Sequence, residues 1–342
     1  MGFVAQRIGI DLGTSNTILV LKNKGLIISE PTIIIVEQKD EHTPLAVGYD
    51  AKVLLGRVTD GVKAIRPLRE GVISDFDMTL VLIEYFIRKA IGVSYLVKPT
   101  VFLSYPCCIS PIELRAVAEA TKLAGCRNVI LVEKPYLSAL GCGLPVTEPD
   151  GCMIVDIGGG TTDIAVLSLG GAVLRHSIRV GGMKMDEAII NYIKLEKGIL
   201  IGDRTAEEIK IDLGAALPLR DPRKARIRGR DTITNLPQMK DVTSEDIYIA
   251  LHEICLALVD SIKYVLSFTP PDLIGAILHG GITLTGGASL LYGLDQLIAS
   301  ELGIPVLLSE SPMDSAAIGL SYLLDDYNST QRFGQSNCIK MM

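Results

Sequence analysis

The sequence lacks the features that define several common classes of protein. No apolar run reaches the roughly 18 residues that a membrane-spanning helix needs. Its 33 basic and 39 acidic residues give a net charge of −6, which argues against a nucleic-acid partner bound through phosphate neutralisation. The 7 cysteines include no C-x-x-C pair, and residues 1–7 are too short for a signal peptide. These absences favour a cytoplasmic protein with reduced thiols.

A glycine-rich turn between two apolar strands, at residues 151–167, is the most informative stretch that the sequence does contain. The first strand ends at Asp156, and the turn that follows holds Gly158, Gly159, Gly160 and Thr161. Consecutive glycines let backbone amides approach a phosphate closely and form an anion-binding concavity. An aspartate at the strand end suits Mg²⁺ held through water and substrate phosphates. A plain hairpin is the alternative, but two residues would suffice for its turn.

A second stretch near the start of the chain has the same plan. Apolar residues lead to Asp11, and a turn of small residues then precedes another apolar strand; the turn consists of Gly13, Thr14, Ser15 and Asn16. Aligning Asp11 with Asp156 matches strand, aspartate, glycine, threonine and strand. Such self-similarity indicates two related halves, each contributing one phosphate hairpin and one aspartate.

Strands and helices alternate along the rest of the chain, which predicts an α/β fold. Apolar spacing predicts a helix over 78–91, and Ser244 is expected to cap a long helix that Pro270 and Pro271 end. Residues 195–249 are more charged and are interpreted as an inserted subdomain. The polar stretch at 328–342 is expected to be disordered.

Four motifs carry a family resemblance that covers residues 6–326. They are GIDLGTSNT at 9–17, VDIGGGTTDIAV at 155–166, RTAEEIKIDLG at 204–214 and ITLTGGASLLYGLD at 282–295. The chain resembles the actin-like ATPase superfamily and, within it, the MreB/Mbl family of bacterial actins. The resemblance implies two duplicated α/β domains that close on Mg²⁺ and ATP or ADP in a cleft between them, each with a smaller inserted subdomain.

The resemblance also implies domain limits and a division of roles among residues. Domain I would comprise 1–146 with 315–330, with a small subdomain at about 32–72, and domain II 147–314, with one at about 186–249. Residues 331–342 would be a flexible tail. Asp11 and Asp156 would hold Mg²⁺ through water, and Thr161 would help place the attacking water. The nucleotide would contact Gly13, Thr14, Ser15, Asn16, Gly158, Gly159, Gly160, Thr161, Gly182, Glu207, Lys210, Gly286 and Gly287.

The pair Glu207 and Lys210 also has a plainer interpretation. In the first interpretation, their i, i+3 spacing puts both side chains on one helix face, where they could contact ribose and adenine. The same spacing would equally allow an exposed ion pair without a ligand.

One position departs from the family pattern in a way that bears on catalysis. The family places a glutamate immediately before the proline that opens the helix after Val132, and it positions or polarises the attacking water. Here that position is Lys134, one residue after Glu133. An ammonium donates hydrogen bonds but cannot accept a proton while charged. Slow hydrolysis is therefore expected, unless a local shift brings Glu133 into the catalytic role.

A membrane contact is expected at residues 92–99. Tyr95, Leu96 and Val97 match an apolar loop through which the family binds lipid, and Lys98 follows them. Such a tip suits shallow insertion at a lipid interface. The alternative is that these side chains cap the core.

The expected function is that of a filament-forming bacterial actin that controls cell shape and hydrolyses ATP weakly. Its partners would be itself in paired protofilaments, the inner face of the cell membrane and membrane adaptor proteins. One alternative is a nucleotide sensor that forms filaments for motility without turnover. Others are a DnaK-type chaperone ATPase, which needs a substrate-binding domain, and a sugar or acetate kinase, for which no catalytic carboxylate can be identified.

Overall fold

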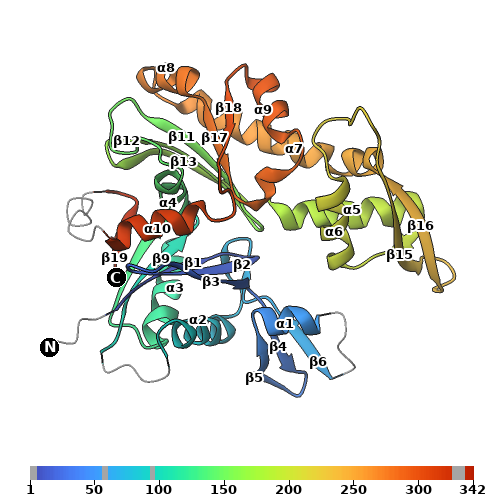
Figure 1. The fold of residues 1–342 in the computed structure, drawn as a ribbon, viewed down its shortest axis with the longest axis horizontal. Helices are drawn as coiled ribbons and strands as arrows, with labels where there is room; N and C mark the ends of the chain where they lie inside the picture. The colour runs from blue at the N-terminus through green and yellow to red at the C-terminus, as the bar shows by residue number, and fades with distance from the viewer. Residues whose placement is uncertain (1–5, 56–60, 93–96, 326–335) are drawn as a thin grey trace.

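Two β-sheets with their helices form the upper and lower parts of the molecule in Figure 1. The computed structural model describes residues 6–55, 61–92, 97–325 and 336–342. Smaller groups of strands and helices extend from both parts on the right of Figure 1, and the C-terminus lies on the left. None of the helices in the described ranges has the length and apolar character to cross a bilayer.

The first sheet holds the hairpin that carries Asp11. Its strand order is β19 (Ile339–Met341), β10 (Asn128–Glu133), β9 (Thr100–Tyr105), β1 (Arg7–Leu12), β2 (Asn16–Leu21) and β3 (Gly25–Pro31). β1 pairs antiparallel with β2 and parallel with β9. Alternate residues of a strand face opposite sides of a sheet. Accordingly, Val101 and Leu103 join the core beneath α2 (Phe76–Ile91) and α3 (Pro111–Leu123), whereas Phe102 packs on the other face.

The second sheet holds the hairpin that carries Asp156. Its order is β13 (Gly171–Ile178), β12 (Thr162–Ser168), β11 (Cys152–Ile157), β17 (Ile282–Thr285) and β18 (Val306–Leu308). One face packs on helices in the upper part of Figure 1, namely α5 (Gly182–Lys197), α7 (Ser244–Phe268), α8 (Pro271–Gly280) and α9 (Leu294–Leu302). The other face contributes Ile154 and Ala165 to a core shared with the first sheet.

Two helices fill the space between the sheets, and glycines let them approach closely. These are α4 (Lys134–Gly141) and α10 (Ser315–Asp325), which share that common core. A Cβ at Gly141 would lie 1.8 Å from the Ser315 carbonyl oxygen, and one at Gly319 would lie 2.0 Å from that of Leu137. The two helix backbones can therefore meet only where both residues lack a side chain.

Smaller sheets and helices complete the fold. On the first sheet's side lie β4 (Ile34–Glu37), β5 (Asp40–Val47), β6 (Val62–Ile65), α1 (Tyr49–Leu54), β7 (Leu68–Arg69) and β8 (Val72–Ile73). On the second sheet's side lie β14 (Ile199–Leu200), β15 (Lys224–Asp231), β16 (Pro237–Thr243), α6 (Asp203–Leu213) and the 3₁₀ helix η1 (Gly287–Leu290). β15 and β16 form the far right of the upper part in Figure 1.

Two local expectations were wrong. Of the stretch 328–342 expected to be disordered, residues 328–335 lie outside the described residues, but Ile339–Met341 form β19 and pair antiparallel with β10. The β10 edge offers backbone groups that need partners, and this short strand supplies them. The long helix α7 is capped by Thr243 rather than by Ser244, since Thr243 and Asp246 form a reciprocal capping box.

Candidate functional site

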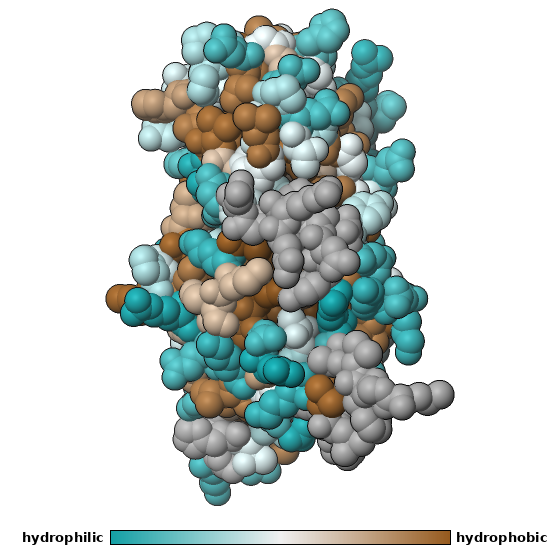
Figure 2. All heavy atoms as spheres, turned by 90° about the vertical axis from the view of Figure 1, so that its left-hand side faces the viewer, coloured by the Kyte–Doolittle hydropathy of each residue, from teal (hydrophilic) through white to brown (hydrophobic). Residues whose placement is uncertain are grey.

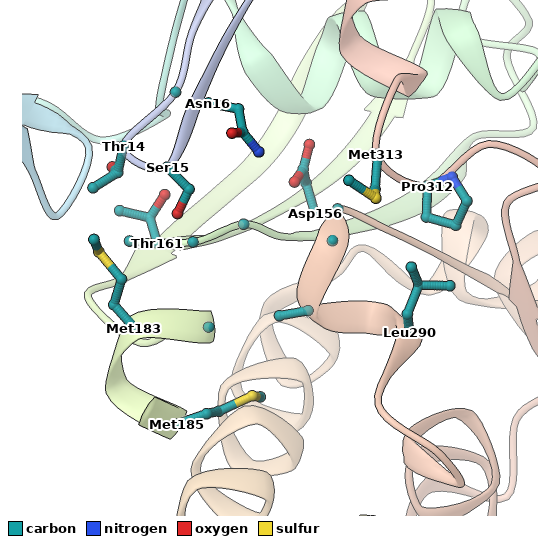
Figure 3. A pocket seen from close by; sticks show the side chains of 18 of the residues that line it. Thr14, Ser15, Asn16, Asp156, Thr161, Met183, Met185, Leu290, Pro312 and Met313 are labelled. Atoms are coloured by element: carbon teal, nitrogen blue, oxygen red, sulfur yellow. The ribbon is translucent and has the colours of Figure 1, made fainter. Parts of the chain in front are cut away.

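A cavity of about 640 Å³ lies between the two sheets. Both hairpins line it, although Asp11 and Asp156 are 145 positions apart in the sequence. Figure 3 shows Thr14, Ser15 and Asn16 of one hairpin close to Asp156 and Thr161 of the other. The duplicated motifs therefore meet across a single site.

The two hairpins are in direct contact, and glycine is required where they touch. A Cβ at Gly159 would lie 2.0 Å from Ser15 Oγ, and one at Gly160 would lie 2.5 Å from Thr14 Oγ1. Gly158 N–H donates to the Thr161 carbonyl within the turn. These glycines keep both backbones accessible to an anion.

The two aspartates are buried at the ends of their strands, and each accepts a hydrogen bond from a serine. Ser104 Oγ donates to Asp11 Oδ1, and Ser138 Oγ donates to Asp156 Oδ2 over 2.5 Å. Asp156 Oδ1 accepts no hydrogen bond within the described part of the chain. Asp156 lines the cavity, and a buried carboxylate oxygen that accepts no hydrogen bond suits a water-bound Mg²⁺. No group of three or more His, Cys, Asp or Glu side chains in the described residues could hold a metal by itself.

Lys134 places a positive charge beside both aspartates. Its Nζ lies 3.8 Å from Asp156 Oδ1, and the side chain remains 20% exposed, so the ammonium borders the cavity. Burial alone would lower the pKa of Lys134, but the charges of Asp11, Asp156 and Asp163 outweigh it and raise that pKa above its ordinary value. Lys134 is therefore a fixed cation at neutral pH.

Glu133 lies outside the cavity. Its side chain is buried, and Oε2 pairs with Arg175 Nε over 2.6 Å. Tyr105 donates its hydroxyl to Glu133 Oε1 at 3.5 Å, and burial with the Glu133 charge raises the pKa of Tyr105. Consecutive residues leaving a strand point in opposite directions, so Lys134 reaches the cavity and Glu133 does not.

Thr161 is oriented by a buried carboxylate. Its Oγ1 donates to Asp163 Oδ2 over 3.0 Å, while the Cys107 N–H donates to Asp163 Oδ1 over 3.0 Å. Burial and the nearby Asp156 charge raise the pKa of Asp163 to about 6, and the hydrogen bond with the Cys108 side chain together with burial raises the pKa of Cys107. Because Cys107 follows the first sheet and Asp163 belongs to the second, this network joins the two sheets.

The helix α6 presents Glu207 and Lys210 to the same cavity. Lys210 Nζ lies 2.8 Å from Asp186 Oδ1 and donates to the Gly182 carbonyl over 2.9 Å. Lys210 thus pairs with α5 rather than with Glu207, and this contact fixes the start of α5 against α6. Burial raises the pKa of Asp186, and the Lys210 charge offsets part of that effect.

The end of the cavity away from the hairpin that carries Thr14 and Ser15 is apolar. Leu290, Pro312 and Met313 line it in Figure 3, together with Gly286 and Gly287. Gly286 has φ 82°, and a Cβ there would lie 2.3 Å from the Ile157 carbonyl oxygen. Only glycine allows this close approach. The surface offers a flat apolar wall for an aromatic base.

The structure brings together nearly all the residues named from the sequence. Except for Glu133, the expected nucleotide, metal and catalytic residues line the one cavity. Of the expected membrane loop, Tyr95 and Leu96 lie outside the described residues, and Val97 is half-buried.

Sequence reasoning missed Asp163 and Asp186 as contributors to the site. Asp163 closes the glycine-rich motif, and Asp186 follows Gly181 and Gly182 by a few residues. A carboxylate near each glycine turn was the signal that could have identified them.

Comparison with solved structures gives the class of protein. MreB 5 of Spiroplasma citri bound to AMPPNP has a TM-score of 0.91 with this chain at 29% identity, over 97% of this chain and 100% of that one. The MamK double helical filament shares the fold, with a TM-score of 0.81 at 20% identity, over 94% of this chain and 99% of that one. Two stacked α/β halves that enclose one cavity lined by glycine hairpins define an actin-like protein.

The family follows from the sequence comparison. The model for "MreB/Mbl protein" matches residues 5–332, and the chain therefore belongs to the MreB/Mbl family. The cell shape-determining protein Mbl of Bacillus cereus is 43% identical over 322 residues, which cover 94% of this chain and 96% of that relative.

Proposed function

We propose that this chain is a bacterial actin that binds ATP with Mg²⁺, assembles into filaments and hydrolyses ATP slowly. The observation that supports this most directly is that both hairpins line one cavity together with Asp156, whose Oδ1 accepts no hydrogen bond within the described residues. The solved relative MreB 5 holds AMPPNP, which supports a nucleotide here.

The residues present fit such a ligand. Asp11 and Asp156 would hold Mg²⁺ through water, and bound Mg²⁺ neutralises charge on phosphate oxygens. Hairpin amides other than those of Gly13 and Gly158, which donate to backbone carbonyls within their turns, would hold the phosphates. Glu207 and Lys210 would contact the sugar and base, beside the apolar wall at Gly286 and Gly287.

The identity of residue 134 supports slow hydrolysis. Lys134 can neutralise phosphate charge but cannot accept a proton from water while it is charged. Glu133 is engaged by Arg175 outside the cavity, so it does not replace the missing base. Loss of a positioned general base typically lowers a rate by about 10²–10⁴-fold. Thr161, oriented by Asp163, would still position water.

Binding and turnover are tested separately. Calorimetry with ATP and Mg²⁺ measures binding to the wild-type chain, and no binding would refute the proposal. Phosphate release is then compared for wild type, Lys134→Glu and the matched control Lys134→Gln. Both substitutions remove the positive charge, but only the carboxylate can accept a proton. We expect release to increase at least ten-fold in Lys134→Glu alone; an equal increase in both would assign the slow rate to charge instead.

We also propose how the protein assembles, where it lies in the cell and what it does there. Membership in the MreB/Mbl family supports self-association into paired protofilaments at the inner membrane face, with adaptor proteins, and a role in cell shape. The family resemblance also supports the proposed division into domain I, at 1–146 with 315–330, and domain II, at 147–314. Sedimentation and electron microscopy with ATP, ADP and a non-hydrolysable analogue test assembly.

A non-hydrolysing filament sensor is the second candidate, and the fixed charge of Lys134 favours it. Assembly that depends on ATP without detectable phosphate release would select that candidate.

A further inference from the structure

Residues 336–342, here called the strap, contact both sheets. Ile339–Met341 extend the first sheet by pairing with β10. Asn337 reaches β13 of the second sheet, where its Oδ1 accepts from Ala172 N–H over 2.9 Å and its Nδ2 donates to the Ala172 carbonyl over 3.0 Å. The strap lies on the left of Figure 1, the side that Figure 2 faces, where apolar and polar atoms are interspersed.

Arg175 of β13 connects the strap to the residue just before Lys134. Its Nε pairs with Glu133 Oε2, and its Nη2 donates to the Asn337 carbonyl over 3.1 Å and to Asn337 Oδ1 over 2.6 Å. The Glu133 N–H donates to the Cys338 carbonyl over 2.9 Å. A planar guanidinium can bind Glu133 and Asn337 at the same time, because its N–H donors point in fixed directions.

The strap also belongs to the core between the sheets. Cys338 and Ile339 are buried in the cluster that contains Tyr136 of α4 and Ala172 of β13. Burial raises the pKa of the Cys338 thiol to about 11, so this thiol is both shielded and protonated at neutral pH. Any movement of β13 relative to the start of α4 must stretch or break these contacts.

We propose that the strap is a latch between the two halves, whose docking holds β13 against the start of α4 and thereby sets the position of Lys134 in the cavity. This inference rests on the proposed nucleotide site, because strap docking would act by changing the affinity of the cavity for nucleotide. A ligand that prefers one arrangement of the sheets changes strap docking, and strap docking changes ligand affinity by the same factor.

Thiol labelling of the full-length chain, resolved by peptide mass spectrometry, measures strap docking. Cys338 reports on the strap, and Cys255, buried in α7, reports on global opening. Asn337→Ala removes both bonds to Ala172, and we expect Cys338 to label at least ten-fold faster while Cys255 stays unchanged. A Cys338 rate equal to that of wild type would overturn the latch.

Two further variants separate the latch from general damage. Arg175→Lys keeps a positive charge near Glu133 but loses the fork that reaches Asn337, so Cys338 labelling should also accelerate. Arg226→Ala is the matched control: its side chain is 69% exposed and pairs with Asp241, and both residues lie on the second sheet's side. Acceleration in the control as large as in Asn337→Ala would contradict a specific role for the strap.

Coupling to the cavity is tested with a non-hydrolysable ATP analogue and Mg²⁺. We expect the analogue to change Cys338 labelling at least three-fold in wild type, and Asn337→Ala to change analogue affinity. Unchanged labelling at saturating analogue would overturn the coupling. Failure of the proposed function looks different: calorimetry would show no analogue binding, while Cys338 labelling would still respond to Asn337→Ala.

Discussion

The buried carboxyl of Asp163 makes the stability of this protein depend on pH in a way that one substitution should remove. Asp163 is 1% exposed and accepts hydrogen bonds from Cys107 and Thr161. Burial and repulsion from Asp156 raise its pKa from 3.8 to about 6, and attraction to Lys134 offsets only part of this. Asp163→Asn keeps the size and an oxygen acceptor but never ionises.

The raised pKa of Asp163 determines whether stability rises or falls with pH. The folded state binds the Asp163 proton more tightly than the unfolded state, so protonation favours folding. This contribution is fully present below about pH 3.8 and is lost as the pH rises through about 6. A gap of about two pKa units corresponds to about 3 kcal/mol in total, of which about 2 kcal/mol falls between pH 4.5 and 7.5.

Urea unfolding of the ligand-free chain, followed by circular dichroism across that pH window, measures the effect. The free energy of unfolding of Asp163→Asn, relative to wild type, should rise by about 2 kcal/mol between pH 4.5 and 7.5. The same substitution at Asp241 is the control, because Asp241 is exposed and the Arg226 hydrogen bond lowers its pKa. If the difference in unfolding free energy between Asp163→Asn and wild type stayed constant or fell as the pH rose, Asp163 would ionise without cost. Burial would then not destabilise its charged form.

Two other substitutions test the site and the packing. Lys210→Ala removes a charge-assisted contact worth about 1.5–3 kcal/mol, so calorimetry should show Mg²⁺–ATP affinity lower by about ten-fold or more. Arg204→Ala, on the same helix but exposed, should bind normally; equal losses would contradict the assignment. Gly319→Ala would put a Cβ 2.0 Å from the Leu137 carbonyl and should lower the free energy of unfolding in urea by about 1–3 kcal/mol or more. Gly275→Ala, a helical glycine with open space around it, should be neutral or stabilising, and an equal loss would refute the steric argument.

Much of the candidate site could be predicted because its signals are local. Asp156 and its glycines lie within a few residues of one another, and so do Asp11 and the small turn that follows it. A tight turn after an apolar strand needs particular residues at particular positions, whatever surrounds it. The duplicated pattern then indicates that two such turns share one ligand.

The strap was misjudged because its structure depends on a distant partner. Ser336 to Met342 carry weak strand signals, and a three-residue strand is not stable alone. It forms because β10 offers an unpaired edge and because Arg175 and Asn337 connect the two sheets there. No local property of these residues predicts that contact.

By itself, the sequence determined the fold class, the two duplicated hairpins and the presence of lysine rather than glutamate at 134. Only the tertiary structure decided that Lys134 faces the aspartates, while Glu133 turns to Arg175, 42 residues away. The physical reason is the range of the forces involved. Turns and strand periodicity depend on neighbours along the chain, whereas the partner of a buried charge is set by which strands the fold places side by side.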